Sequence, residues 1–191
     1  MLIEQPARWL RLFYPHALWR MNKNEHAVYI TFDDGPIPEA TPIILDILDE
    51  FDVKAMFFVV ADNAVKYPEL FEEIKRRGHM VGNHTYHHFG SFKHWTLSYA
   101  VDVTKADAIV KSPYFRPPHG ILRHTVYWWI KQHYRVVMWD LVTRDYSKYL
   151  TAEDVVNNVK RYVRNGSIIT FHDSLKSIEK LKTALPQSCL L

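Results

Sequence analysis

Short apolar segments alternate with helical segments along most of the chain, and this alternation constrains the fold more than any other feature of the sequence. Six runs rich in β-branched and aromatic residues are predicted to be buried strands, at residues 27–30, 54–60, 79–83, 113–116, 135–139 and 167–171. Helices are predicted between and after them, at residues 39–51, 63–77, 97–110, 123–133, 151–164 and 175–184. Strands that alternate with helices pair in parallel through right-handed crossovers. The pattern therefore predicts an α/β fold, either an open doubly wound sheet or an incomplete (β/α) barrel.

The composition is that of an ordinary globular protein. The 191 residues are most simply one domain, residues 1–191, with 48% apolar and 24% charged residues. A formal charge of +3 gives no argument for a nucleic-acid partner. Because Cys189 is the one cysteine, neither an intramolecular disulfide nor a thiolate metal site is possible within the chain.

The N-terminal segment, residues 1–26, is expected to pack on the barrel. No uncharged run reaches the ~18 residues of a membrane span, so no transmembrane segment is expected. Residues 8–20 are basic and aromatic, and contact with a membrane surface is the alternative to packing across one end of the domain. The N-terminus lacks the layout of a signal peptide, which predicts a cytoplasmic location, with association with the cell envelope as the alternative.

Two adjacent carboxylates, Asp33 and Asp34, lie where the first predicted strand ends and where Gly35-Pro36 turns the chain away. Adjacent carboxylates repel each other, so a fold that holds both at a strand end usually supplies an opposite charge, and a metal ion is the obvious candidate. A solvated turn is the alternative. If one carboxylate binds a metal, the other is free to act as a general base.

A pair of histidines follows the third predicted strand. His84 and His88 are four residues apart, so on a helical turn both imidazoles would face the same way. With one aspartate they would form a two-His, one-carboxylate site that leaves coordination positions open for water and substrate. His87 is a competing ligand, and a solvated histidine loop is the alternative.

Further polar groups follow other predicted strands, and the carboxyl ends of parallel strands share one rim. Arg116 could orient a buried carboxylate, although a lone arginine is more often in a surface salt bridge. His172 could protonate a leaving amine, with Asp145 or Asp140 holding its ring. Candidate walls of a substrate groove, each of which could instead be core, are Tyr86, Pro118, Trp139, Tyr146 and Phe171.

Taken together, five short motifs resemble those of the polysaccharide deacetylase family, which is carbohydrate esterase family 4 with the NodB homology domain. They are Thr-Phe-Asp-Asp-Gly-Pro (31–36), His-Thr-x-x-His (84–88), Arg-Pro-Pro-His-Gly (116–120), the stretch from Trp139 to Asp145, and Thr-Phe-His-Asp (170–173). The resemblance covers residues 27–173, which it marks as the catalytic core.

The resemblance implies a distorted (β/α) barrel of about seven strands and a divalent metal, most commonly Zn²⁺, with Co²⁺ or Mn²⁺ as alternatives. It also implies an acetylated carbohydrate substrate, from which acetyl groups are removed by hydrolysis. By motif position, Asp33 matches the base, and Asp34, His84 and His88 match the metal ligands. Arg116 matches the partner of the base, and His172 matches the acid with Asp145 behind it.

Two departures from the family pattern bear on these expectations. Tyr146 stands where many members have Trp, and the chain ends at Leu191 without the usual final strand, so the barrel is expected to close incompletely. Three other functions remain open: an O-acetyl esterase of the xylan type on the same site, a non-catalytic glycan-binding module, and a non-haem iron oxygenase. The last is disfavoured by the α/β alternation and by the separate His172 and Arg116.

Overall fold

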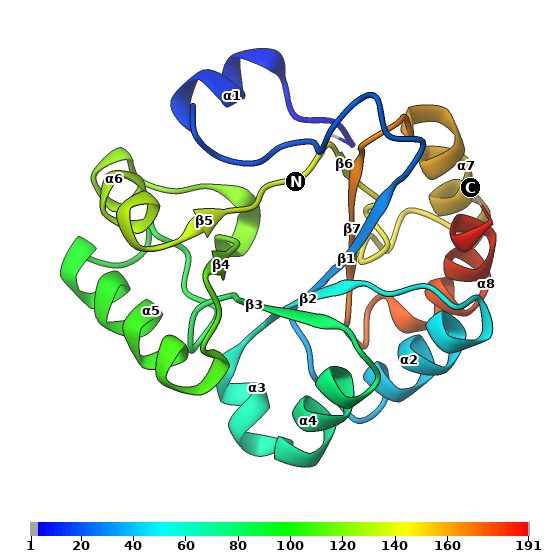
Figure 1. Ribbon diagram of the computed structural model, residues 1–191, viewed down its shortest axis with the longest axis horizontal. Coiled ribbons are helices and arrows are strands. Elements are labelled where there is room, and N and C mark those ends of the chain that lie inside the picture. The colour runs from blue at the N-terminus through cyan, green and yellow to red at the C-terminus, as the bar shows by residue number, and fades with distance from the viewer. Residues whose placement is uncertain (1–3, 191) are drawn as a thin grey trace.

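The structure is a computed structural model that describes residues 4–190. Within these residues, seven parallel strands form one sheet that curls into an open barrel with helices around its outside (Figure 1). The strands are β1 (Tyr29–Asp33), β2 (Met56–Val59), β3 (Met80–Asn83), β4 (Tyr114–Phe115), β5 (Arg135–Val136), β6 (Leu141–Val142) and β7 (Ile168–His172). Their order in the sheet is β5-β4-β3-β2-β1-β7-β6. The predicted distorted barrel of about seven strands is confirmed.

The helices follow the predicted alternation. They are α1 (Arg8–Phe13), α2 (Thr41–Glu50), α3 (Ala61–Lys66), α4 (Pro68–Arg76), α5 (Thr96–Val110), α6 (His124–His133), α7 (Ala152–Tyr162) and α8 (Ile178–Cys189). The start of α7 is defined by a capping box, in which Thr151 accepts from the Asp154 amide and Asp154 accepts from the Thr151 amide.

Three predicted boundaries are wrong. The single helix expected at residues 63–77 is two helices, because Pro68 disfavours helical geometry at Tyr67, which has φ −128° and ψ 62°. The strand expected at 135–139 is shorter, and the two-residue β6 follows it as a separate strand that the sequence analysis missed. The last helix begins and ends later than residues 175–184.

The N-terminal segment lies between the two edges of the sheet. The Leu18 amide donates to the Val136 carbonyl at 2.8 Å, and the Leu18 carbonyl accepts from the Met138 amide at 2.8 Å. Two residues later, Arg20 forms an antiparallel bridge with Ser167, next to β7. Residues 18–21 therefore connect the β5 edge to the β7 side, which is a more specific role than the predicted packing on the barrel.

Side chains alternate between the inside and the outside of the barrel, as they must along a strand. Phe32 and Phe171 stack at 5.8 Å between ring centroids, and both belong to the core that α2, α7 and α8 cover. Their neighbours Thr31, Asp33 and His172 point to the other face. This alternation sends apolar groups to the helices and polar groups to the barrel interior.

Candidate active site

A cavity of about 490 Å³ opens at the carboxyl ends of the strands. Its lining includes Asp33 from the end of β1, Arg116 just after β4 and His172 from the end of β7. Asp34, His84 and His88 from the loops after β1 and β3 also line it. The residues that the sequence analysis expected at one rim therefore converge on a single cavity.

Asp34, His84 and His88 form a compact group in which one ligand atom from each residue lies within 4.8 Å of the others. The Asp34 Oδ1 atom is 3.1 Å from His88 Nε2 and 3.7 Å from His84 Nε2. The predicted helical turn between the histidines is wrong, since residues 84–90 contain no helix. The imidazoles converge because Thr85 and His88 take left-handed backbone conformations, with φ of 66° and 57°.

The protonation states of this group suit a divalent metal. Burial lowers the pKa of His84 to about 4, so its ring is neutral at neutral pH. His84 Nδ1 must donate to the Arg116 carbonyl at 2.8 Å, which leaves the Nε2 lone pair facing Asp34. Burial opposes ionisation of Asp34, but the hydrogen bond from His88 and the nearby imidazoles hold its pKa well below its usual range. The donor set is therefore two imidazole nitrogens and one carboxylate, as a metal with open coordination positions requires.

The competing ligand His87 points away from this group. Its Nδ1 contacts the buried carboxylate of Asp102 on α5. The other Asp102 oxygen, Oδ2, accepts from the Tyr86 and His87 amides at 3.0 and 3.1 Å. Asp102 thus holds the loop between the two metal-ligand candidates, and the sequence analysis missed it because a single aspartate in a polar helix pattern carries no signal of a distant contact.

Asp33 lies beside the proposed metal ligands and is held by Arg116. The fully buried guanidinium donates through Nη1 to Asp33 Oδ1 at 2.7 Å and to Thr31 Oγ1 at 2.7 Å. Its other nitrogens donate to the Val137 and Met138 carbonyls at 3.3 and 2.8 Å. These four bonds fix the guanidinium, and therefore the orientation of the carboxylate that it contacts.

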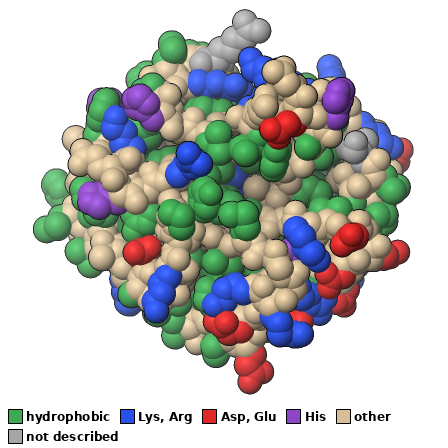
Figure 2. Space-filling model, in the orientation of Figure 1, with side chains coloured by type: hydrophobic (Ala, Val, Ile, Leu, Met, Phe, Trp, Pro, Cys, Tyr) green, Lys and Arg blue, Asp and Glu red, His purple; other side chains and the backbone are tan. Residues whose placement is uncertain are grey.

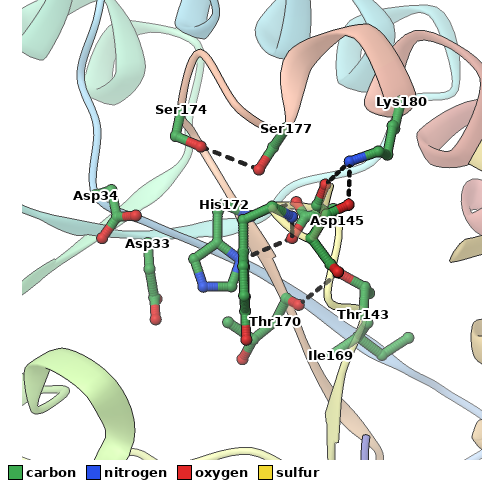
Figure 3. Close-up of polar contacts among 12 residues, drawn as sticks. Asp33, Asp34, Thr143, Asp145, Ile169, Thr170, His172, Ser174, Ser177 and Lys180 are labelled. Carbon is green, nitrogen blue, oxygen red and sulfur yellow. Dashed lines mark hydrogen bonds and ion pairs between the residues drawn. The ribbon is translucent and has the colours of Figure 1, made fainter. Parts of the chain in front are cut away.

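His172 lies at the end of β7, next to Asp33 at the end of the neighbouring strand β1, and its ring stands between Asp145 and the two aspartates (Figure 3). Its Nδ1 bonds Asp145 Oδ1 at 2.8 Å, and its amide donates to Asp145 Oδ2 at 2.7 Å. Burial alone would lower the pKa of His172, but the charge and hydrogen bond of Asp145, together with Asp34 and Asp33, raise it to about 9.

The loop that carries Asp145 is fastened to α8 by Lys180. The Lys180 ammonium donates to the Asp145 and Ser147 carbonyls, at 2.7 Å each (Figure 3). The alternative partner for His172, Asp140, lies elsewhere. It bonds Arg164, Arg11 and Ser167 beside the first residues of β7, at the end of the sheet opposite His172.

Of the predicted substrate contacts, Trp139 and Tyr146 line the cavity, and the edge of the Tyr146 ring meets His172 at 4.6 Å between centroids. The other three predicted contacts are corrected, since none of them lines the cavity. Phe171 is fully buried on the helix side of β7, Pro118 is buried in a short 3₁₀ turn, and Tyr86 packs under Lys105.

Other cavity residues were missed by the sequence analysis. His119 lines the cavity and its ring meets His88 at 4.9 Å between centroids, although it stands inside the Arg-Pro-Pro-His-Gly motif. Ser174, Leu175 and Lys176 line it from the loop after β7, where no motif draws attention to them.

Comparisons with known proteins agree with this architecture. Residues 20–137 match a family model described as polysaccharide deacetylase. A peptidoglycan-N-acetylglucosamine deacetylase of Bacillus cereus is 36% identical over 176 residues, which are 86% of this chain and 64% of that protein. A chitooligosaccharide deacetylase of Azorhizobium caulinodans is 30% identical over 81% of this chain and 77% of its own length. The crystal structure of the Bc1960 peptidoglycan N-acetylglucosamine deacetylase superposes with a TM-score of 0.82 at 32% identity, over 96% of this chain and 90% of that one.

Proposed function

The chain belongs to the polysaccharide deacetylase family, and from that premise we propose that it is a metal-dependent hydrolase that removes acetyl groups from N-acetylated sugars. The observation that carries the proposal is that three groups meet at one cavity. The first is the carboxylate of Asp33 with Arg116, and the second is the candidate metal group of Asp34, His84 and His88. The third is the imidazole of His172 with Asp145.

Asp34, His84 and His88 would hold the divalent metal, for which we propose Zn²⁺ first and Co²⁺ or Mn²⁺ as alternatives. When bound, such an ion lowers the pKa of water and polarises a carbonyl group. No other described group in the cavity combines two imidazoles and a carboxylate at this spacing.

The chain's own residues divide the proton transfers between Asp33 and His172. Asp33, oriented by Arg116, accepts a proton from the water that attacks the acetamide carbonyl. His172 donates a proton through Nε2 to the leaving sugar amine, while Asp145 keeps the opposite ring nitrogen protonated. The C–N bond breaks, and the products are acetate and the free amino sugar.

For the substrate we propose N-acetylglucosamine residues of peptidoglycan, because two of the relatives above 30% identity are named as enzymes that act on it. Chitooligosaccharides are the second candidate, on the grounds of the Azorhizobium relative. Leu175 and Lys176, in the loop after β7, are exposed where they line the cavity, and we propose that this loop distinguishes the two substrates.

Acetate release tests the proposal. Protein stripped of metal and then given Zn²⁺, Co²⁺ or Mn²⁺ is incubated with peptidoglycan fragments, chitin oligomers and acetylxylan. We expect metal-restored acetate from the N-acetylated glycans. Release from acetylxylan alone would favour the O-acetyl esterase, and glycan binding without any release would favour the binding module.

A further inference from the structure

Eight large hydrophobic side chains are exposed on three neighbouring outer elements, α1, α6 and the start of α5 with the loop before it. We call this set the aromatic flank. It consists of Trp9, Leu12, Phe13, Phe92, Trp95, Leu97, Val101 and Trp128. The most exposed tryptophan, Trp95, is 82% accessible, and Trp9 is 62% accessible. In Figure 1, α1, α6 and α5 follow one another down the left side of the molecule.

Contacts between these elements hold them side by side. Tyr14, which follows α1, meets Tyr127 of α6 edge-on at 5.1 Å between centroids. The guanidinium of Arg123, at the start of α6, lies 5.8 Å from the centroid of Phe92 and donates to the Phe92 carbonyl at 2.9 Å. The exposed side chains of the flank are therefore carried by neighbouring elements, with α1 beside α6 and α6 beside the loop before α5.

The flank is also cationic. Residues 5–24, 74–101 and 108–139, which build it, contain no aspartate or glutamate. Two aspartates lie between the second and third of these stretches: Asp102 is buried and bonded to His87, and Asp107 is half-buried in the second half of α5, beyond the start of the helix that carries the flank. Lys93, Arg123 and Lys131 lie among the apolar side chains, and the Lys131 ammonium sits 3.3 Å above the Trp128 ring. Figure 2 shows most of the visible acidic side chains toward the right and the bottom, away from this side.

The chemistry of this surface matches an anionic bilayer. A contiguous exposed apolar patch on a folded domain marks an interaction site. Tryptophan is enriched where one side of its ring is apolar and the other is wet, as at the interface of a membrane. Interspersed lysine and arginine are attracted to anionic headgroups. Within residues 4–190, no helix has the length and apolar character needed to cross a bilayer, so the flank would lie on the surface of a membrane.

We propose that the aromatic flank docks the protein on an anionic phospholipid surface, with Trp9, Trp95 and Trp128 in the interfacial layer and the neighbouring cations against the headgroups. The docking does not depend on the proposed hydrolysis. It does have a consequence for the cavity, since Gly90 in the loop before α5 lies against His119, which lines the cavity. The docked protein holds the cavity rim beside the bilayer.

Flotation with phospholipid vesicles tests the proposal. Vesicles of phosphatidylcholine alone are compared with vesicles of equal parts phosphatidylcholine and phosphatidylglycerol. The variant Trp9→Ser/Trp95→Ser/Trp128→Ser removes the exposed rings of the flank. The matched control, Val65→Ser/Met80→Ser/Tyr149→Ser, removes exposed hydrophobic side chains from other parts of the surface. Near-UV circular dichroism and acetate release check that each variant is folded.

We expect the wild-type protein and the control to float with the anionic vesicles and not with the neutral ones. The flank variant should lose at least ten-fold in vesicle binding, and Lys93→Glu/Arg123→Glu/Lys131→Glu should lose binding as well. Brominated lipid should quench the tryptophan fluorescence of the wild-type protein. Equal flotation of the flank variant and the wild type would overturn the proposal. The proposal would also be overturned if the wild-type protein were a dimer that does not bind vesicles and the flank variant were a monomer. The flank would then bind a second copy of the chain.

Discussion

At the scale of single residues, two carboxylates that are neighbours in the sequence have different surroundings. Asp33 contacts the guanidinium of Arg116, whereas Asp34 contacts the imidazole of His88. The peptide between them separates the roles because Asp34 has φ 83°, a left-handed conformation that turns its side chain away from the direction of the strand. The Asp33 carboxylate therefore faces the permanently charged guanidinium of Arg116, and the Asp34 carboxylate faces the candidate metal position.

This difference predicts the effect of Asp33→Asn. The amide oxygen can still accept from Arg116, but the side chain can no longer take a proton. We expect kcat to fall by about 10²- to 10⁴-fold, the usual contribution of a general base, with metal affinity unchanged. Steady-state kinetics and titration of the stripped protein with Zn²⁺ measure the two quantities. Asp46→Asn on the exposed side of α2 is the control, and full turnover in Asp33→Asn would rule out the assigned base.

His172 predicts a pH dependence of both stability and activity. Its pKa in the fold, about 9, lies above the ordinary value of 6.5. Protonation of His172 therefore stabilises the fold fully below pH of about 6.5, and this contribution is lost as the pH rises through about 9. The proton available for the leaving amine is lost over the same alkaline range.

The variant Asp145→Asn checks this assignment, because it removes the charge that holds the proton on His172. We expect the alkaline limb of the pH–rate profile, and the alkaline decline of Tm, to move to lower pH in the variant. If both variant and wild type lose activity at the same alkaline pH, another group controls the limb.

At the scale of elements, the loop of residues 84–88 shows how a helix can position ligands that it does not carry. Asp102 on α5 accepts two amides and contacts one imidazole of this loop, between the two proposed metal ligands. Such supporting contacts to a metal site are typically worth 10- to 100-fold in affinity.

We therefore expect Asp102→Ala to weaken Zn²⁺ binding by about 10- to 100-fold, measured by competition with a chelator. His87→Ala removes only the side-chain bond and leaves both amides bonded to Asp102, so it should weaken binding less. Equal affinities in Asp102→Ala and the wild type would show that the loop keeps its shape without this anchor.

The elements also show what the sequence could predict. Four site residues could be predicted because each follows an apolar run that is easily recognised as a strand: Asp33, His84, Arg116 and His172. Parallel strands end at a common rim, so these residues were expected to lie together. Asp102 and Lys180 were missed because their partners are loop backbone atoms that only the tertiary fold brings near. β6 was missed because two residues show no periodicity, and the break at Tyr67 was missed although Pro68 signals it.

At the scale of the whole molecule, the barrel depends on a piece of chain that belongs to none of its strands. The backbone of Leu18 bonds the Val136 carbonyl and the Met138 amide. In the same stretch, the carbonyls of Val137 and Met138 accept from Arg116. The N-terminal segment is therefore connected to the candidate base through two sets of hydrogen bonds.

Leu18→Pro tests this connection, since proline removes the amide that donates to Val136. An unsatisfied buried carbonyl costs about 1–3 kcal/mol, so we expect thermal and denaturant unfolding to show a loss of that size, together with reduced kcat. Leu18→Ala keeps the amide and should lose less on both counts. A normal kcat in a destabilised Leu18→Pro protein would mean that Arg116 does not depend on this segment.

The position of residues 18–21 also has a consequence for synthesis of the chain. These residues leave the ribosome well before their partners at 136–138 and 166–167 are made. Until then, residues 18–21 have no partners in the sheet, and the interior around Arg116 is open to water. Contacts between segments so distant in sequence form late, because their loop-closure entropy must be met before they stabilise anything. The charged interior of the barrel is therefore sealed only after residues 136–138 and 166–167 have been made.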